Sequence, residues 1–206
     1  MHIKIEKRLA EIRLEALRRQ LNPHFTFNAI NSLQYFILKN ETEAALGHLG
    51  KLANLIRNTL DISARQVITL AEEIAYLKDY AYIENARINH RVNINITAER
   101  TLDLETIQIP PMLIHPFIEN AFIHAFSGAQ LKPSLDIYFQ LDSPKLLTCQ
   151  IKDNGKGFDT SGISVGIDLV VERLIIWFSS NKKPVEVNSE RMKGTSVKLF
   201  IQLQKD

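Results

Sequence analysis

The chain has 206 residues, of which 45% are hydrophobic and 23% charged, and its formal net charge at pH 7 is +2. This composition excludes an intrinsically disordered protein, and so small a net charge gives no reason to expect a nucleic-acid partner. The single cysteine, Cys149, excludes an internal disulfide and a cysteine-rich zinc site, and its apolar surroundings predict a buried strand residue. No apolar run approaches the ~20 residues that span a bilayer.

The first third of the chain has the apolar spacing of helices. From about residue 5 to residue 38 this spacing begins as a coiled-coil seam, so the chain opens inside a helix that needs a partner and an upstream segment is expected. A second helix over residues 42–63 carries an apolar stripe. Its members are Leu46, Leu49, Leu52, Leu55, Ile56 and Leu60.

Two helices with such stripes form a hairpin that cannot bury both stripes by itself. We therefore expect dimerisation into a four-helix bundle. The alternative is a hairpin that packs against the rest of its own chain.

The rest of the chain interleaves helices with strands. Thr69 followed by Glu72 predicts a capping box that opens a third helix, which ends near Asn89. Alternating apolar and polar residues then predict a strand over residues 92–98, and Pro110 with Pro111 predicts the start of a helix. The expected strands cover residues 92–98, 135–141, 146–152, 185–189 and 196–202, and the expected helices cover 110–126 and 166–178.

This order of elements predicts an α+β fold. A helical-hairpin dimerisation unit over residues 1–66, forming a four-helix bundle in the dimer, is expected to precede an α/β two-layer sandwich domain over residues 67–206. We expect the boundary near residues 64–70.

His24 is a candidate nucleophile because it directly follows Pro23 on an amphipathic helix. Proline has no amide proton to donate and clashes with the preceding turn, so the helix is expected to kink or loosen where His24 projects. An imidazole is neutral for much of the time near pH 7, and one ring nitrogen then keeps the lone pair that a nucleophile needs. The alternative is an ordinary polar helix residue.

The helix expected over residues 110–126 carries polar side chains among apolar ones. The carbonyl oxygen of Asn120 can be a hard ligand for Mg²⁺, with a helix cap or a buried hydrogen bond as the alternative. His124 lies one turn beyond Asn120. The spacing of His115, Glu119 and His124 does not match the H-E-x-x-H pattern of a zinc site.

Asp153, Gly155 and Gly157 follow the strand expected at residues 146–152. Closely spaced glycines let the backbone approach a flat ring or a phosphate, and a carboxylate at a strand end can accept a hydrogen bond from an amine such as adenine N6. A tight turn is the alternative use of these residues. Two further places could hold anions through backbone amides: Gly166 at a helix start, and Gly194 with Thr195 before the last strand.

In their order along the chain, these segments resemble the cytoplasmic kinase core of LytS-type sensor histidine kinases. That family belongs to the ATPase superfamily that also contains gyrase, mismatch-repair and chaperone ATPases. LNPHFTFN at residues 21–28 is similar to the family's phosphoacceptor box, and IPPMLIHPFIENAFIHAF at 109–126 is similar to its N-box. DNGKGF at 153–158, SVGIDLVVERL at 164–174 and GTSVKLFI at 194–201 resemble its three glycine boxes.

The resemblance implies a sensor histidine kinase core that uses Mg-ATP to phosphorylate His24 and passes the phosphoryl group to an aspartate of a response regulator receiver domain. It implies that Asn120 holds Mg²⁺ on the phosphates and that Asp153 reads adenine. It also implies the cytoplasmic domain of an inner-membrane sensor protein that meets the membrane only through an upstream segment. The homodimer expected from the helical stripes and the absence of a nucleic-acid partner expected from the charge agree with this reading. The other expected nucleotide contacts are His124, Gly155, Gly157, Gly166, Gly194 and Thr195.

Two more residues are catalytic candidates. Asn28, one helical turn after His24, could orient the imidazole or a water molecule, and Glu119 could reach the imidazole from the other domain. Phe25 stands where the larger class of histidine kinases has an acidic residue that can serve as base, so the identity of the general base stays open.

Three positions depart from the family pattern. His115 stands where the family usually has glutamine, Ser164 replaces the first glycine of the second glycine box, and Leu169 replaces its asparagine. These departures keep open a signalling dimer with a degraded nucleotide site. A conformational ATPase of the gyrase kind is a further alternative, but Pro116 occupies the place of its water-activating glutamate, four residues before Asn120.

Overall fold

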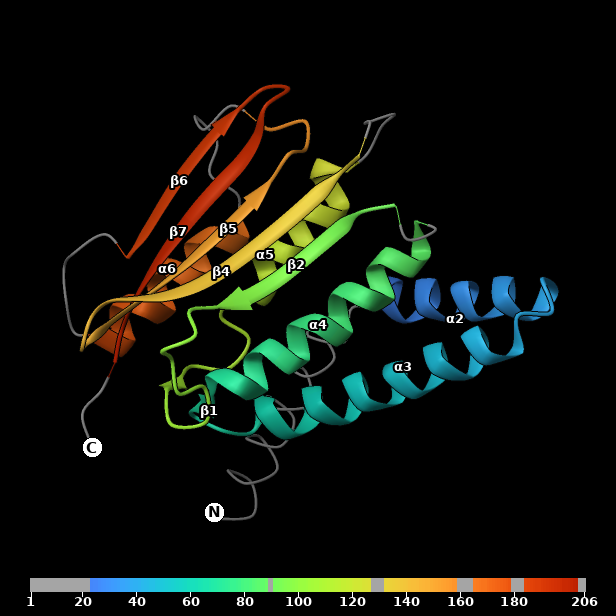
Figure 1. The fold of residues 1–206 in the computed structure, drawn as a ribbon, viewed down its shortest axis with the longest axis horizontal. Helices are drawn as coiled ribbons and strands as arrows, with labels where there is room; N and C mark the ends of the chain where they lie inside the picture. The colour runs from blue at the N-terminus through green and yellow to red at the C-terminus, as the bar shows by residue number, and fades with distance from the viewer. Residues whose placement is uncertain (1–22, 89–90, 127–131, 159–164, 179–183, 204–206) are drawn as a thin grey trace, which may run out of the picture.

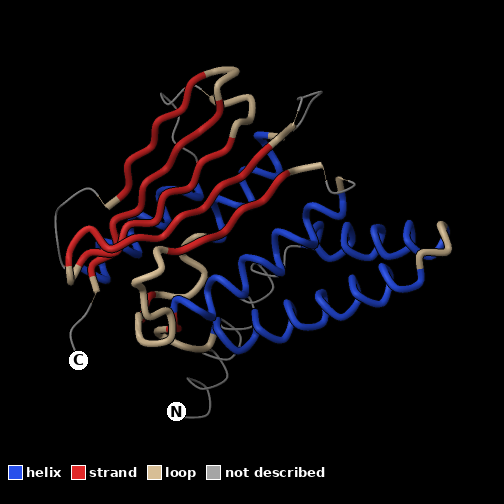
Figure 2. Tube along the Cα trace, viewed as in Figure 1, coloured by secondary structure: helices blue, strands red, loops and turns tan. Residues whose placement is uncertain are grey.

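The computed structural model describes residues 23–88, 91–126, 132–158, 165–178 and 184–203. Helices come first and a five-stranded sheet follows, so the predicted α+β fold class is confirmed (Figures 1 and 2). The helical segments are α2 (Pro23–Leu38), α3 (Thr42–Ser63), α4 (Leu70–Arg87), α5 (His115–Asn120), the π-helix η1 (Ala121–Ala125) and α6 (Val165–Phe178). The strands are β1 (Ile68–Thr69), β2 (Asn93–Ala98), β3 (Gln108–Ile109), β4 (Ser134–Ser143), β5 (Leu146–Asp153), β6 (Val185–Glu190) and β7 (Gly194–Gln202).

Helices α2 and α3 form an antiparallel hairpin, and α4 packs against both of them (Figure 1). The apolar stripe predicted on α3 divides between two faces. Leu52 and Leu55 are buried, whereas Leu46, Leu49 and Leu60 are exposed. The hairpin therefore packs on its own chain and still presents an outer apolar face. The part of the first predicted helix before residue 23 lies outside the described residues.

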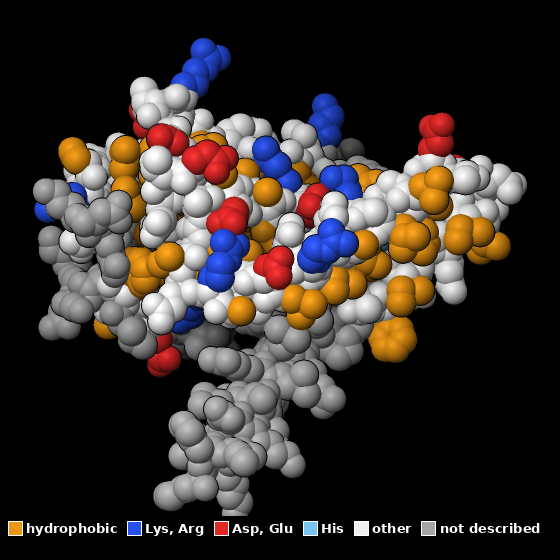
Figure 3. Space-filling model, turned by 90° about the horizontal axis from the view of Figure 1, so that it is seen from below, with side chains coloured by type: hydrophobic (Ala, Val, Ile, Leu, Met, Phe, Trp, Pro, Cys, Tyr) orange, Lys and Arg blue, Asp and Glu red, His pale blue; other side chains and the backbone are white. Residues whose placement is uncertain are grey.

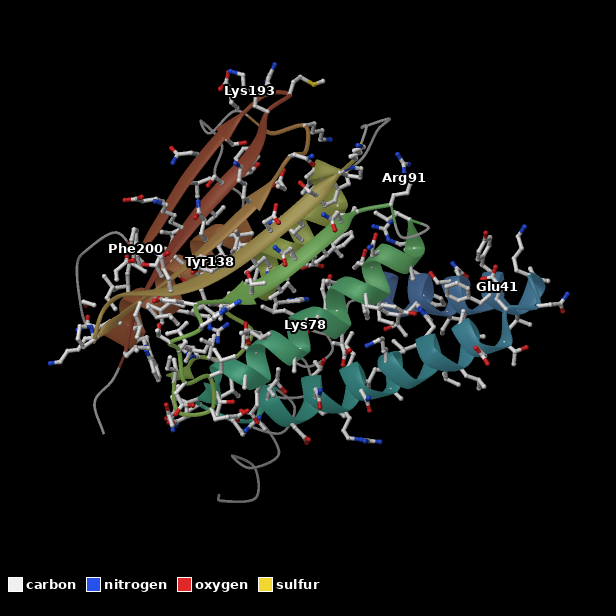
Figure 4. All side chains as sticks on the ribbon, in the orientation of Figure 1. Glu41, Lys78, Arg91, Tyr138, Lys193 and Phe200 are labelled. Atoms are coloured by element: carbon white, nitrogen blue, oxygen red, sulfur yellow. The ribbon has the colours of Figure 1, made fainter. Side chains whose placement is uncertain are left out.

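The five-stranded sheet has the order β2-β4-β5-β7-β6, in which β2 pairs parallel to β4 and the other neighbours are antiparallel. Helices α5 and α6 lie behind the sheet as drawn in Figure 1, and the front face is open. Leu135, Ile137 and Phe139 of β4 are buried towards the helices. Tyr138, between them, is 38% exposed on the open face (Figure 4). Cys149 of β5 is buried, as predicted.

The start of α4 is capped as predicted. The Glu72 amide donates to Thr69 Oγ1 at 3.2 Å, and the Thr69 amide donates to Glu72 Oε2 at 2.8 Å. A short pairing of β1 with β3, which the sequence pattern did not predict, aligns Ile68 with Ile109 beside this cap. None of the helices within the described ranges is long and apolar enough to cross a bilayer.

The prediction that Pro110 and Pro111 open a helix is wrong. The helix begins at His115, and the residues before it form a loop in which Met112 has the left-handed φ of +53°. This loop is held by the fully buried Glu73 of α4, which accepts hydrogen bonds from the Met112 amide at 2.9 Å and from the Ile114 amide at 3.1 Å. Amides bonded to a carboxylate cannot also continue a helical ladder, so the helix starts later.

Candidate functional site

Asp153 lies at the end of β5, where two backbone amides meet its carboxylate. The Gly155 amide donates to Asp153 Oδ1 at 2.8 Å, and the Thr195 amide donates to the same oxygen at 3.3 Å. The side chain is buried, and burial raises its pKa, although these amides and the Thr195 side chain lower it. A buried carboxylate anchored in this way is a fixed acceptor at the rim of the sheet.

The glycines around Asp153 allow close approach of backbone segments. A Cβ on Gly155 would lie 2.3 Å from the Ala125 Cβ at the end of η1. Gly157 has a φ of +59°, and a Cβ there would lie 2.0 Å from the Glu190 carbonyl oxygen. Gly194, with a φ of +92°, is packed equally tightly on the Asp153 carbonyl. These glycines therefore have a packing role in addition to the ligand contact and the tight turn that the sequence suggested.

The turn between β6 and β7 clamps the segment that follows Asp153. The Met192 amide donates to the Lys156 carbonyl at 2.6 Å, and the Phe158 amide donates to Ser189 Oγ at 2.9 Å. Ser189 Oγ also lies 3.0 Å from Thr195 Oγ1. Asp153, Gly155, Gly157, Gly194 and Thr195, all proposed from sequence as nucleotide contacts, thus come together at one end of the sheet.

Asn120 is the last residue of α5, and the wider turns of the π-helix begin directly after it. π-helical segments are rare and often mark functional sites. The Asn120 side chain is half-buried, and no residue in the described ranges forms a hydrogen bond with it. His124 lies within the π-helix and is exposed. The Lys156 amide donates to the Ala125 carbonyl at 3.1 Å, which joins this helix to the Asp153 segment.

A narrow cleft separates the first turns of α2 from α5. Asn28 and Glu119, proposed from sequence as catalytic residues, both line it. The sequence reasoning missed the contribution of α4, where Arg87 contacts Glu84 at 3.0 Å. From the sequence alone this i, i+3 pair resembles an ordinary surface ion pair, so no local signal pointed to it. The lining residues are Phe25, Asn28, Tyr80, Glu84, Arg87, Glu119 and Ile123.

Aromatic contacts join the two sides of this cleft. The Phe25 ring stacks on Tyr80 with centroids 5.0 Å apart, and the His115 ring meets Tyr80 edge-on at 4.3 Å. His115 is half-buried as a residue, but its Nε2 is enclosed and has no hydrogen-bond partner among the described residues. Burial lowers the pKa of His115 to about 4. Its ring is therefore neutral at pH 7.

Three sequence-predicted positions are placed by their backbone alone. His24 is the second residue of α2, directly before Phe25, and the structure describes its backbone but not its side chain. Gly166 is the second residue of α6. Ser164 and the side chain of Leu169 lie outside the described residues.

The residues present fit ATP and Mg²⁺. The buried Asp153 carboxylate is an acceptor for an exocyclic amine, and the Asn120 amide oxygen is the kind of hard ligand that Mg²⁺ takes from proteins. Within the described ranges, no group of three or more His, Cys, Asp or Glu side chains could hold a metal ion. Protein ligation of Mg²⁺ here would be sparse, which is usual where phosphates supply the other ligands.

The known proteins that this chain resembles are histidine kinases. Residues 12–92 match the family model described as histidine kinase. The chain is 32% identical over 151 residues to the sensor histidine kinase/phosphatase LytS of Staphylococcus aureus strain MRSA252, and the same values hold for strain Mu50. The match covers 73% of this chain and 25% of LytS, so the chain spans about a quarter of the length of these relatives.

Solved structures give the fold. The histidine kinase domain of the Erythrobacter litoralis EL346 blue-light activated histidine kinase has a TM-score of 0.50 and 17% identity, with 87% of this chain and 93% of that domain covered. A longer structure of the same kinase also has a TM-score of 0.50, with 20% identity and coverage of 91% and 60%.

Gly155→Ala should destabilise the protein because the new Cβ would overlap Ala125. Overpacking of this kind costs about 1 to 3 kcal/mol. Gly47→Ala is the matched control, since an added Cβ at Gly47 meets no atom within 4 Å and alanine favours the helix by up to about 1 kcal/mol. Urea unfolding followed by circular dichroism measures both. Equal stability of the two variants would show that Gly155 is not packed as described.

His115→Gln should alter how stability depends on pH. The unfolded chain takes up a proton on His115 near pH 6.5, which the folded protein resists until about pH 4, so stability is lost as the pH falls across this range. The wild type should therefore lose roughly 2 to 3 kcal/mol relative to His115→Gln between pH 7 and pH 4. Urea unfolding at both pH values measures this difference, and parallel pH profiles would contradict the buried, neutral imidazole.

Proposed function

Because the chain belongs to the histidine kinase family, we propose that it uses Mg-ATP to phosphorylate His24 and passes the phosphoryl group to an aspartate of a response regulator receiver domain. One observation carries this proposal. The first turns of α2, which contain His24, face the end of α5 across one cleft, and Asn120 follows directly on Glu119 of that cleft. The acceptor helix and the proposed metal ligand are thus neighbours.

The nucleotide is proposed to lie between the end of β5 and the α5–η1 helix. Asp153 accepts the adenine amine, and the backbone around Gly155, Gly166 and Thr195 lies along the rest of the ligand. Asn120 provides an oxygen to Mg²⁺, with His124 one turn further on. Mg-ATP supplies the transferable phosphoryl group and the cation that balances its charge.

The residues of the chain act mainly by positioning. A neutral His24 imidazole has the lone pair for attack, and the Phe25–Tyr80 stack holds the backbone beside it in place. Asn28 and Glu119 are proposed to orient the imidazole, since both line the cleft that also contains Phe25, the residue directly after His24. Glu119 can also accept the imidazole proton if the two side chains meet in the reacting state.

A homodimer is proposed from the outer face of the hairpin. Figure 3, seen from below, shows hydrophobic side chains gathered over the helical end of the molecule. Pairing this face with a second copy gives a four-helix bundle, and burying each leucine contributes about 1.5 to 3 kcal/mol. The exposed apolar residues on α2 and α3 are Phe27, Ile30, Tyr35, Ile37, Leu38, Leu46, Leu49 and Leu60.

The division into a dimerisation unit, residues 1–66, and an ATP-binding domain, residues 67–206, is part of the same proposal. Because the chain spans a quarter of LytS, we propose that it is the cytoplasmic kinase core of a longer, membrane-bound sensor.

Incubation with γ-labelled ATP and Mg²⁺ tests the function. We expect label on the protein that is lost in acid and kept in alkali, as for a phosphoramidate. His24→Gln should abolish it while His2→Gln, the matched control, keeps it. Asp153→Asn should abolish it through loss of the adenine contact. Label that survives in His24→Gln would overturn the assignment. Release of free phosphate alone would indicate a conformational ATPase, and neither product would indicate a degenerate nucleotide site.

Leu49→Glu should convert the dimer to monomers, because Leu49 is 48% exposed on the outer face and a buried carboxylate there is costly. Tyr138→Glu is the matched control, a similarly exposed apolar side chain on the open face of the sheet (Figure 4). Light scattering at tens of micromolar should find monomers for the first variant and dimers for the second. A monomeric parent protein would contradict the bundle.

A further inference from the structure

A hollow of about 390 Å³ lies where three elements meet, on α6 and away from the cleft and from Asp153. The end of α3 and the segment after it form one wall, the loop before α5 forms the second, and the last turns of α6 form the third. Its volume is in the range of small-molecule pockets. We refer to it as the junction hollow. It is lined by Ser63, Arg65, Gln66, Pro111, Met112, Arg173 and Trp177.

The lining of the junction hollow is rich in donors. Arg65 and Arg173 bring two guanidinium groups, and no carboxylate is among the described lining residues. The two acidic side chains that interact with these arginines, Glu72 and Glu73, also have other partners. Glu72 accepts from Arg65 at 2.8 Å and from the backbone of its own helix cap, and Glu73 accepts from the loop amides. An anion would therefore meet donors here, while the Glu73 carboxylate, which acts on Arg173 from the protein interior, is bonded to the loop amides.

Trp177 provides an independent indication of a ligand. Its indole Nε1 is enclosed, and no described residue accepts a hydrogen bond from it. Buried donors are normally paired, and an unpaired one is a cost to the folded protein that a bound acceptor removes. The indole ring, Pro111 and Met112 also give the hollow an apolar wall.

The Arg173 side chain is held in a position from which it can bind an anion. One guanidinium nitrogen donates to the Pro111 carbonyl at 2.7 Å, which leaves its other donors available. Burial lowers the pKa of Arg173, with Glu73 opposing the change, so the cation is partly stripped of water. A partly desolvated guanidinium gains more from an anion than one in water does.

We propose that the junction hollow binds a small organic anion, whose carboxylate or phosphate oxygens accept hydrogen bonds from Arg65, Arg173 and Trp177 Nε1 while its apolar part rests on Met112. Such a ligand touches both the end of α3 and the loop that leads into α5. Occupancy would thus fasten the helical hairpin to the helix that ends at Asn120. The site is separate from the proposed phosphotransfer reaction and does not depend on it.

Trp177 is the only tryptophan of the chain, so its fluorescence reports the junction hollow directly. Phenyl phosphate and benzoate serve as anionic probes, and benzyl alcohol as the neutral probe of similar size. We expect the Trp177 fluorescence to change saturably with at least one anion, with half-saturation at millimolar concentration. Benzyl alcohol should leave the fluorescence unchanged. No response to either anion, or an equal response to benzyl alcohol, would overturn the proposal.

Two variants separate ligand contact from local structure. Arg65→Gln should weaken binding of the anion by about tenfold or more, because it removes a charged donor. Glu72→Gln breaks the same ion pair but keeps Arg65, so it should leave binding unchanged or tighten it. If both variants bound the anion equally weakly, or if Arg65→Gln bound it as tightly as the wild type, the proposed site would be wrong. Trp177→Phe, followed by calorimetry, should weaken binding several-fold because the ring remains and only the N–H donor is lost.

Discussion

The arrangement of the second half of the molecule depends on one buried carboxylate. Glu73 of α4 binds the amides of Met112 and Ile114, thirty-nine and forty-one residues away along the chain. Burial raises its pKa to about 7, against the effect of these amides and of Arg173. A charge buried in an apolar interior is costly unless hydrogen bonds compensate it. The loop is therefore most stable in the conformation that directs the Met112 and Ile114 amides to the Glu73 carboxylate. That conformation sets where α5 begins and therefore where Asn120 lies.

The aromatic contacts extend this constraint to the helical hairpin. Phe25, Tyr80 and His115 come from α2, α4 and α5, and each ring touches the next. His115 suits this place because a neutral imidazole can meet an aromatic ring edge-on. The hairpin and the sheet domain are thus joined by packing beside the proposed phosphoacceptor as well as by the chain itself.

Local patterns predicted most of the elements, and distant contacts account for the differences. The capping box of Thr69 and Glu72 and the strand predicted over residues 135–141 need only neighbouring residues, and both predictions were right. The late start of α5 depends on Glu73, which no local pattern reveals. The cleft likewise needs α4, whose Glu84–Arg87 pair looks like a surface pair until the fold places it beside α2. The order of the motifs suggested that Asp153 and Gly194 serve one site, which stays a prediction. The close backbone approach at Gly155 and Gly157 depends on Ala125 and Glu190, which are distant in the sequence.

The single parallel pairing in the sheet has a consequence for how the protein is assembled. Strands β4 and β5 are joined by a tight turn and can form as a local hairpin, but β2 reaches β4 only through a crossover that contains α5. A chain that lacks β2 therefore leaves the outer side of β4 without a partner strand. In such a chain β4, with its alternating apolar residues, is an open edge that can pair with another chain. A shortened version of this protein that is to stay monodisperse must therefore begin before β2.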